Sequence, residues 1–296
     1  MNVLVIGHLS LDLVKGPHGE TIQEYGGIAR AITTLGSLAG ARDQVVPVCA
    51  VPAADLPALG ALLEPYPAVS TAGLFTGREE LPRIPGVELA REGHAHEHHP
   101  QSPIPFERIR RHLAADRVLI NMVSGRDITL ETMDEIRIAV RDRQVPIHLD
   151  MHNLTLRRSP AGALVRGPVE LWRRWAFMVD TVQLNEQEIG ALTIEKSDEL
   201  HTAGHLLTLG PHAVIVTRGE RGMSLYTNEH KRLMREDLPL EGSPAVMAGL
   251  GCGDVFGAAF VARRAAGDDP LQAARAAGAV VSQRCRDRAA ATPEKA

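Results

Sequence analysis

Aromatic residues, cysteines and long apolar runs are all scarce in this chain of 296 residues. Phe, Trp and Tyr make up 3% of it, so a core must be built from Ala, Val, Leu and Ile. The three cysteines, Cys49, Cys252 and Cys285, form no C-x-x-C pair, which argues against a disulfide framework or a zinc site. Without an 18-residue apolar run or a signal-peptide pattern, we expect a cytoplasmic protein with no membrane partner.

An excess of basic charge is also missing. The formal net charge is −4 and the isoelectric point is near 6.4, so nucleic acid is not an expected partner. The sequence contains neither a G-x-x-x-x-G-K-[ST] phosphate loop nor a G-x-S-x-G nucleophile elbow. Apolar residues make up 44%, enough for a large core, and no linker or repeat divides residues 1–296. We therefore expect one α/β domain.

Short apolar segments alternate with amphipathic ones, which predicts a mostly parallel sheet with helices on both faces. A helix is predicted over Leu130–Arg141, because Met133, Ile136 and Val140 share one face. The predicted buried strands are Asn2–Gly7 (continued by His8–Leu13), Gln44–Val51, Asp116–Asn121, Val145–Asp150, Phe177–Leu184 and Ala213–Thr217.

Three alternating glycines, Gly249, Gly251 and Gly253, precede Asp254 and a helix-like apolar run. Glycines leave backbone amides uncovered, and a helix beginning here adds the positive end of its dipole. Together they can form an anion site in which Asp254 addresses a hydroxyl. On spacing alone, the favoured interpretation is that Gly-Asp only caps a helix.

Gly251-Cys252-Gly253-Asp254 resembles the Gly-Ala-Gly-Asp signature of the ribokinase-like (PfkB) carbohydrate and nucleoside kinases, with Cys252 where Ala is usual. The resemblance implies that Asp254 is the catalytic base and that the amides of Gly251, Cys252 and Gly253 form an anion hole. The helix N-terminus is expected to lower the pKa of Asp254.

Two further motifs resemble the nucleotide side of the family. Asn185-x-x-Glu188 resembles its Asn-x-x-Glu motif, and Thr217-x-Gly219-x-x-Gly222 resembles its phosphate loop. The resemblance implies ATP bound near Asn185, Thr217, Gly219 and Gly222, with Mg2+ organised by Glu188. An ordinary Asn N-cap is the alternative for Asn185.

The acceptor side matches less well. Asp12, the pair Gly26-Gly27 and Asp150 stand at positions where the resemblance implies substrate contacts. Ala31 occupies the place of a usual Asn, with Arg30 as a substitute, and His152 replaces the Asn of an Asp-x-Asn motif. A short β lid is expected around residues 11–25 and part of 70–100.

Two other stretches carry expectations. The histidine tract at His94–His99 is a candidate for metal binding or for substrate contact. In the family that the chain resembles, many members have Asp-Thr-Thr before Gly-Ala-Gly-Asp, and some use this region to hold potassium. Because Ala248-Gly249-Leu250 offers no side-chain oxygen, little potassium activation is expected.

The resemblance as a whole implies a phosphotransferase that moves the ATP γ-phosphoryl group to a hydroxyl of a sugar-like or nucleoside-like molecule. ATP and Mg2+ are the implied cofactors, and dimers are common in the family, which leaves a homodimer open. The altered acceptor side supports a rival, a ribokinase-like nucleotide- or polyol-binding protein with impaired catalysis.

Overall fold

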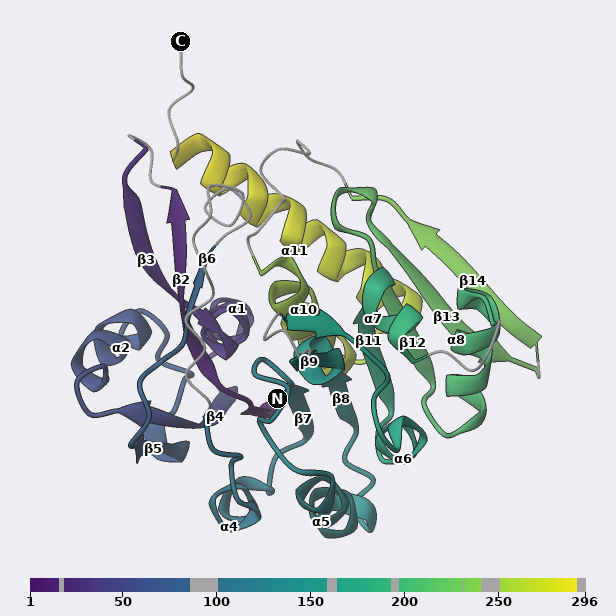
Figure 1. Cartoon of the computed structure of the whole chain (residues 1–296), viewed down its shortest axis with the longest axis horizontal. Helices are drawn as coiled ribbons and strands as arrows, with labels where there is room; N and C mark the ends of the chain where they lie inside the picture. The colour runs from purple at the N-terminus through teal and green to yellow at the C-terminus, as the bar shows by residue number, and fades with distance from the viewer. Residues whose placement is uncertain are drawn as a thin grey trace.

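The computed structural model describes residues 1–15, 19–85, 101–158, 164–192, 197–230, 232–240 and 251–291. Within them, a nine-stranded sheet has the order β14-β13-β12-β11-β8-β7-β1-β4-β5 (Figure 1). Neighbouring strands from β5 to β12 pair in parallel, whereas β13 pairs antiparallel with both β12 and β14. The expected α/β class with a mostly parallel sheet is confirmed.

The central strands are short and apolar, and they are buried on both faces, as parallel sheets covered by helices require. In β1, for example, Val3 to Ile6 are fully buried. The strands are β1 (Asn2–Ile6), β4 (Gln44–Pro52), β5 (Leu74–Gly77), β7 (Arg117–Asn121), β8 (Ile147–Asp150), β11 (Thr181–Asn185), β12 (Ala213–Thr217), β13 (Met223–Glu229) and β14 (Arg232–Leu238).

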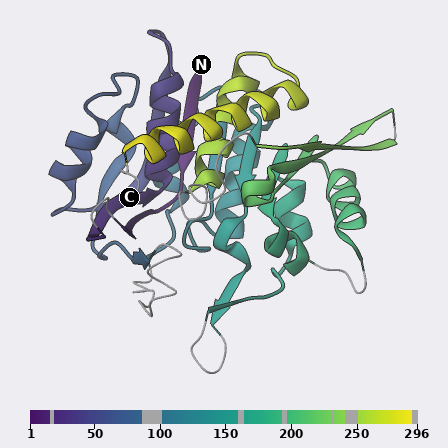
Figure 2. The ribbon, with the colours of Figure 1, turned by 90° about the horizontal axis from the view of Figure 1, so that it is seen from above.

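Helices cover both faces of this sheet. The helices α1, α10 and α11 pack on one face, and α4 to α8 pack on the other, as the buried clusters and Figure 2 show. The helices are α1 (Ile28–Leu38), α2 (Leu56–Leu63), α4 (Phe106–Ile109), α5 (Leu130–Arg141), α6 (Trp172–Phe177), α7 (Glu186–Ala191), α8 (Glu199–Thr208), α10 (Cys252–Ala265) and α11 (Pro270–Ala291). Short 3-10 turns are η1 (Thr71–Gly73), η2 (Arg110–His112), η3 (His152–Thr155) and η4 (Gly219–Arg221).

A second sheet of three strands has the order β3-β2-β6, with β2 at Leu9–Lys15, β3 at Thr21–Gly27 and β6 at Arg83–Pro85. It contains most of the segment expected as a lid, although β5, from the same expected region, belongs to the large sheet. A small pair, β9 (Leu156–Arg158) and β10 (Leu164–Arg166), is antiparallel.

Several boundaries differ from expectation. The chain leaves the large sheet after Ile6. Residues 9–13, which were expected to continue β1, instead lie in β2 of the small sheet, and Asp12 lies within that strand. The strand expected over Phe177–Leu184 is the end of α6 followed by β11, because Trp172, Trp175 and Ala176 supply a buried helical face. The predicted bounds of α5 are confirmed. The tract His94–His99 and the segment Ala248–Leu250 lie outside the described residues.

No helix in the described part of the chain is both long enough and apolar enough to cross a membrane.

Candidate functional site

Polar residues gather at the carboxyl ends of adjacent parallel strands, the edge where open α/β sheets bind ligands. Asn121 ends β7, Asp150 ends β8, Asn185 ends β11 and Thr217 ends β12. The first turn of α10 reaches the same edge, because Gln183 in β11 donates its Nε2–H to the carbonyl oxygen of Gly253 at 2.9 Å.

The turn before α10 is built on Gly251. Its φ of 61° and ψ of 37° lie in the left-handed region, which favours glycine. A Cβ at this position would lie 2.5 Å from Cδ of Arg30 and 2.7 Å from Oδ2 of Asp254. Helix α10 begins at Cys252, so the amides of its first turn lack intrahelical partners. The backbone therefore has the form expected of an anion hole.

Asp254 lies in this first turn and is buried. Its Oδ1 accepts a hydrogen bond of 2.6 Å from Nδ2 of Asn121. Burial raises the pKa of Asp254, while His152, Arg30 and the Asn121 hydrogen bond oppose that rise. The expectation that the helix N-terminus would lower this pKa was wrong, because desolvation of the carboxylate outweighs its favourable contacts. A raised pKa makes Asp254 a better proton acceptor.

Arg30 connects Asp254 with Asp12. Its Nη1 forms an ion pair with Oδ2 of Asp12, and Ser10 Oγ donates to Oδ1 of Asp12 at 2.8 Å. Burial alone would lower the pKa of Arg30, but the charges of Asp12 and Asp254 raise it. Asp12 and the turn at 251–254 therefore share one site, with a guanidinium beside both carboxylates.

The pair Gly26-Gly27 lies against this cluster. A Cβ at Gly26 would overlap the carboxylate of Asp12, and one at Gly27, whose φ is 59°, would lie 2.5 Å from the carbonyl oxygen of His8. These glycines allow β3 to approach β2 closely beside Asp12.

Asp150 occupies the centre of the group. Its Oδ2 accepts from Nε2 of Gln183 at 2.8 Å, and its Oδ1 accepts from the amide of His152 at 3.2 Å. Burial raises the pKa of Asp150 to about 8; His152 opposes the rise, whereas Glu188 and Asp254 add to it. The Asp150 side chain is therefore mostly protonated and neutral at pH 7.

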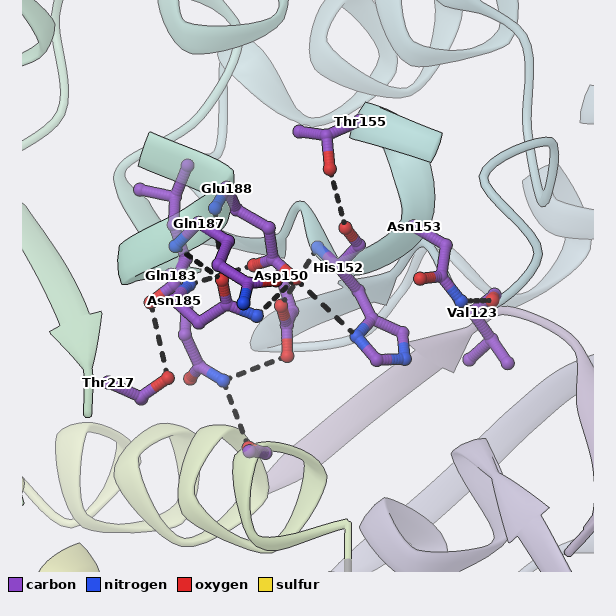
Figure 3. Close-up of polar contacts among 12 residues, drawn as sticks. Val123, Asp150, His152, Asn153, Thr155, Gln183, Asn185, Gln187, Glu188 and Thr217 are labelled. Atoms are coloured by element: carbon purple, nitrogen blue, oxygen red, sulfur yellow. Dashed lines mark hydrogen bonds and ion pairs between the residues drawn. The ribbon is translucent and has the colours of Figure 1, made fainter. Parts of the chain in front are cut away.

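The side chains of Asp150, His152 and Glu188 converge from β8, η3 and α7 (Figure 3). The Nδ1 atom of His152 lies 4.0 Å from Oε1 of Glu188, and Nη2 of Arg166 lies 3.1 Å from the same oxygen. Burial lowers the pKa of His152, but the charges of Asp254, Asp150 and Glu188 outweigh burial and raise that pKa. His152 adopts a left-handed φ of 35°, which is uncommon outside glycine.

Asn185 and Glu188 form a capping box at the start of α7. Glu188 Oε2 accepts from the Asn185 amide at 2.8 Å, and Glu188 Oε1 accepts from Asn185 Nδ2 at 2.6 Å. The N-cap reading of Asn185 is thus correct in geometry.

Glu188 also fits a role toward magnesium. Asn185 and Arg166 both contact Oε1 of this buried carboxylate, whereas Oε2 accepts the Asn185 amide and keeps a second acceptor position, which suits contact with metal-bound water. No group of three or more His, Cys, Asp or Glu side chains within the described ranges is arranged to hold a metal ion directly.

The loop after β12 requires two glycines in left-handed conformations, Gly219 at φ 58° and Gly222 at φ 89°. A Cβ at Gly222 would overlap the carbonyl oxygen of Leu238. Thr217 donates its hydroxyl to the carbonyl oxygen of Leu184 at 3.3 Å. Arg218 forms ion pairs with acids of α7 and α8, so its charge is compensated within the protein.

Sequence reasoning missed Asn121, Gln183 and Arg166. The first two carried a recognisable signal, because each is a polar residue near the carboxyl end of an otherwise apolar strand. Arg166 carried no such signal, since only folding brings β10 against α7.

Comparisons with known proteins agree with this geometry. Residues 161–296 match the family model described as pfkB family carbohydrate kinase. No curated protein matches the chain. Among solved structures, aminoimidazole riboside kinase from Salmonella enterica is 18% identical, with a TM-score of 0.70 and coverage of 99% of this chain and 96% of that one.

Two other solved structures are similar over nearly the whole chain. Ribokinase from Arabidopsis thaliana, complexed with ribose and ATP, has a TM-score of 0.68 at 16% identity and covers 99% of this chain and 96% of its own. A pyrophosphate-dependent kinase in the ribokinase family, complexed with a pyrophosphate analog and myo-inositol, has a TM-score of 0.69 at 18% identity. The match covers 97% of this chain and 95% of that one.

Proposed function

Because residues 161–296 match the family model described as pfkB family carbohydrate kinase and the chain has the ribokinase-like fold, we propose that it is a small-molecule kinase. It transfers a terminal phosphoryl group to a hydroxyl of a sugar-like or nucleoside-like acceptor. The observation that carries the proposal is Asp254, a buried carboxylate with a raised pKa at the uncovered N-terminus of α10 and in one cluster with Asp12.

The amides of Gly251, Cys252 and Gly253 receive the migrating phosphoryl group, whose equatorial oxygens carry the charge of a loose transition state. Asp254 orients the acceptor hydroxyl and takes its proton at Oδ2, because Oδ1 is engaged by Asn121. The raised pKa of Asp254 makes its carboxylate a stronger proton acceptor than an exposed aspartate.

On the donor side, Asn185, Thr217, Gly219 and Gly222 bind the phosphates and ribose of ATP. Glu188 would hold magnesium through water, and the ion would neutralise charge on the donor phosphates. Pyrophosphate is an alternative donor, since a structurally similar kinase is described as pyrophosphate-dependent.

On the acceptor side, Asp12, Asp150 and the Gly26-Gly27 backbone bind the hydroxyls of the acceptor. Asp12 is engaged by Arg30, so an acceptor must share or replace that ion pair. A neutral Asp150 can donate a hydrogen bond as well as accept one, which suits a polyol.

The Arg30–Asp12 ion pair also supports the rival function, a protein that binds nucleotide or polyol without transferring phosphate. A panel of sugars, nucleosides, sugar acids and cyclitols, each assayed with ATP and with pyrophosphate, separates the two. We expect donor consumption with at least one acceptor, abolished in Asp254→Asn. Saturable binding without turnover across the panel would establish the rival.

A further inference from the structure

A cavity of about 580 Å³ lies at the edge of the large sheet opposite the candidate site. The amino-terminal ends of β7, β8, β11 and β12 bound it, together with the carboxyl-terminal half of α10. Since these strands are parallel, the candidate site occupies one end of them and this cavity the other. Its volume lies within the range of about 300–1,000 Å³ typical of small-molecule sites.

The cavity wall is strongly basic in a chain of net negative charge. Four arginines line it, namely Arg117, Arg137, Arg141 and Arg264, whereas its one lining carboxylate among the described residues is Asp180. Asp180 is already engaged, because its Oδ2 accepts from Nη2 of Arg137 and from the Ile147 amide, both at 2.7 Å. Arg141 pairs with the exposed Asp142 at 3.7 Å, so Arg117 and Arg264 supply the positive charge of the cavity.

Arg117 and Arg264 carry most of this uncompensated charge. Within the described ranges, neither guanidinium forms an ion pair with a carboxylate; Nη2 of Arg117 donates instead to the carbonyl oxygen of Arg264 at 2.9 Å. Burial and the charge of Arg264 lower the pKa of Arg117, while the charges of Asp180 and Asp116 oppose that fall. An anion bound beside these two guanidiniums would stabilise their positive charge.

His148 adds a polar group to the same wall. Its side chain is buried beneath Phe260, at 5.6 Å between ring centroids. Burial lowers the pKa of His148 to about 4, although an interaction with the Gln183 side chain opposes the fall. His148 is therefore a neutral polar group in the wall, and the positive charge of the cavity comes from its arginines.

We propose that this cavity binds a small molecule carrying phosphate groups, held by Arg117 and Arg264, with Arg141 at the opening. Arg141 is suited to the opening because 74% of its side chain is exposed. Arginine presents paired donors that match phosphate oxygens, which selects phosphate over a neutral guest of the same size. The site is distinct from the anion hole, since α10 extends from one to the other.

The test is calorimetric titration with inorganic pyrophosphate as the probe. We expect two binding events in the wild-type protein, one at the anion hole and one in the basic cavity. The double variant Arg117→Gln, Arg264→Gln should weaken one event about tenfold or more, because charge-assisted hydrogen bonds are lost. The matched control is Arg263→Gln, on the neighbouring exposed arginine that pairs with Asp268 and does not line the cavity.

Equal titrations in the double variant and the control would overturn the proposal. If the double variant does not fold, the Nε–H resonances of Arg117 and Arg264 in the wild-type protein provide the second measurement. Their shift on addition of pyrophosphate, saturating with the second calorimetric event, is the expected result. Absence of any shift at saturation would reject the site.

Discussion

The donor side and the acceptor side of the candidate site differ in what fixes their geometry. On the donor side, glycines in left-handed turns and the capped start of α7 shape the backbone, and this half of the chain matches the family model. On the acceptor side, side chains decide the site: Arg30 bonds Asp12, and His152 stands beside Asp150. Backbone conformation therefore defines the proposed donor side, whereas side-chain contacts define the proposed acceptor side.

The largest expected effect lies where the two sides meet. Asp254→Asn should lower kcat by roughly 10²–10⁴-fold, because the proton acceptor is lost while the anion hole stays intact. Steady-state kinetics with the acceptor found in the panel measures this loss. Donor binding, measured by titration, should change little. Wild-type kcat in the variant would remove Asp254 from the mechanism.

Two glycine substitutions should distinguish the acceptor side of the site from the donor side. Gly26→Ala places a methyl group against the Asp12 carboxylate and should raise the acceptor KM about tenfold with an unchanged donor KM. Gly222→Ala places one against the carbonyl oxygen of Leu238 at a positive φ and should raise the donor KM instead. If both variants raise the KM of the same substrate, the assignment of the two glycines to different sides is wrong. Circular dichroism is needed to show that each is folded.

Asp150→Asn should have a smaller, pH-dependent effect. With its pKa at about 8, Asp150 is protonated at pH 7, so a neutral amide should change kcat/KM only a few-fold there and more strongly above pH 8. The folded-state pKa exceeds the ordinary value of 3.8, so the folded protein holds this proton more tightly than the unfolded chain. This residue's contribution to stability should therefore fall as pH rises from about 4 to about 8.

Urea unfolding of the wild type and of Asp150→Asn across that window measures the contribution. We expect the variant to lack part of the wild-type decline. An identical decline in both proteins would show that Asp150 is not the group responsible.

The smallest expected effect concerns magnesium. Arg166 neutralises part of the charge of Glu188, so Arg166→Gln should lower the magnesium concentration for half-maximal activity by a few-fold. Kinetics at varied magnesium and fixed donor measures this change. Arg157→Gln, on the neighbouring strand β9, is the matched control. An increased requirement would indicate that Arg166 binds the donor phosphates directly.

Much of the fold could be read from the sequence, because buried parallel strands are short apolar runs and α5 has a regular apolar face. The donor motifs were also legible, since left-handed turns demand glycine at fixed spacing. The raised pKa of Asp254 could not be predicted from the sequence, because the burial of this carboxylate depends on how α10 packs on the sheet. The ion pair of Arg30 with Asp12 joins helix α1 to strand β2, and local sequence patterns do not predict such a contact.

The hairpin of β13 and β14 should unfold locally from its tip. Its base is buried, whereas Asn228, Glu229 and most of β14 are exposed, and the tip extends away from the body of the protein (Figure 2). Amide hydrogens near the tip should therefore exchange with solvent much faster than those at the base. Gly222 contacts Leu238 at the slowly exchanging end, so the hairpin can fray without disturbing the loop after β12.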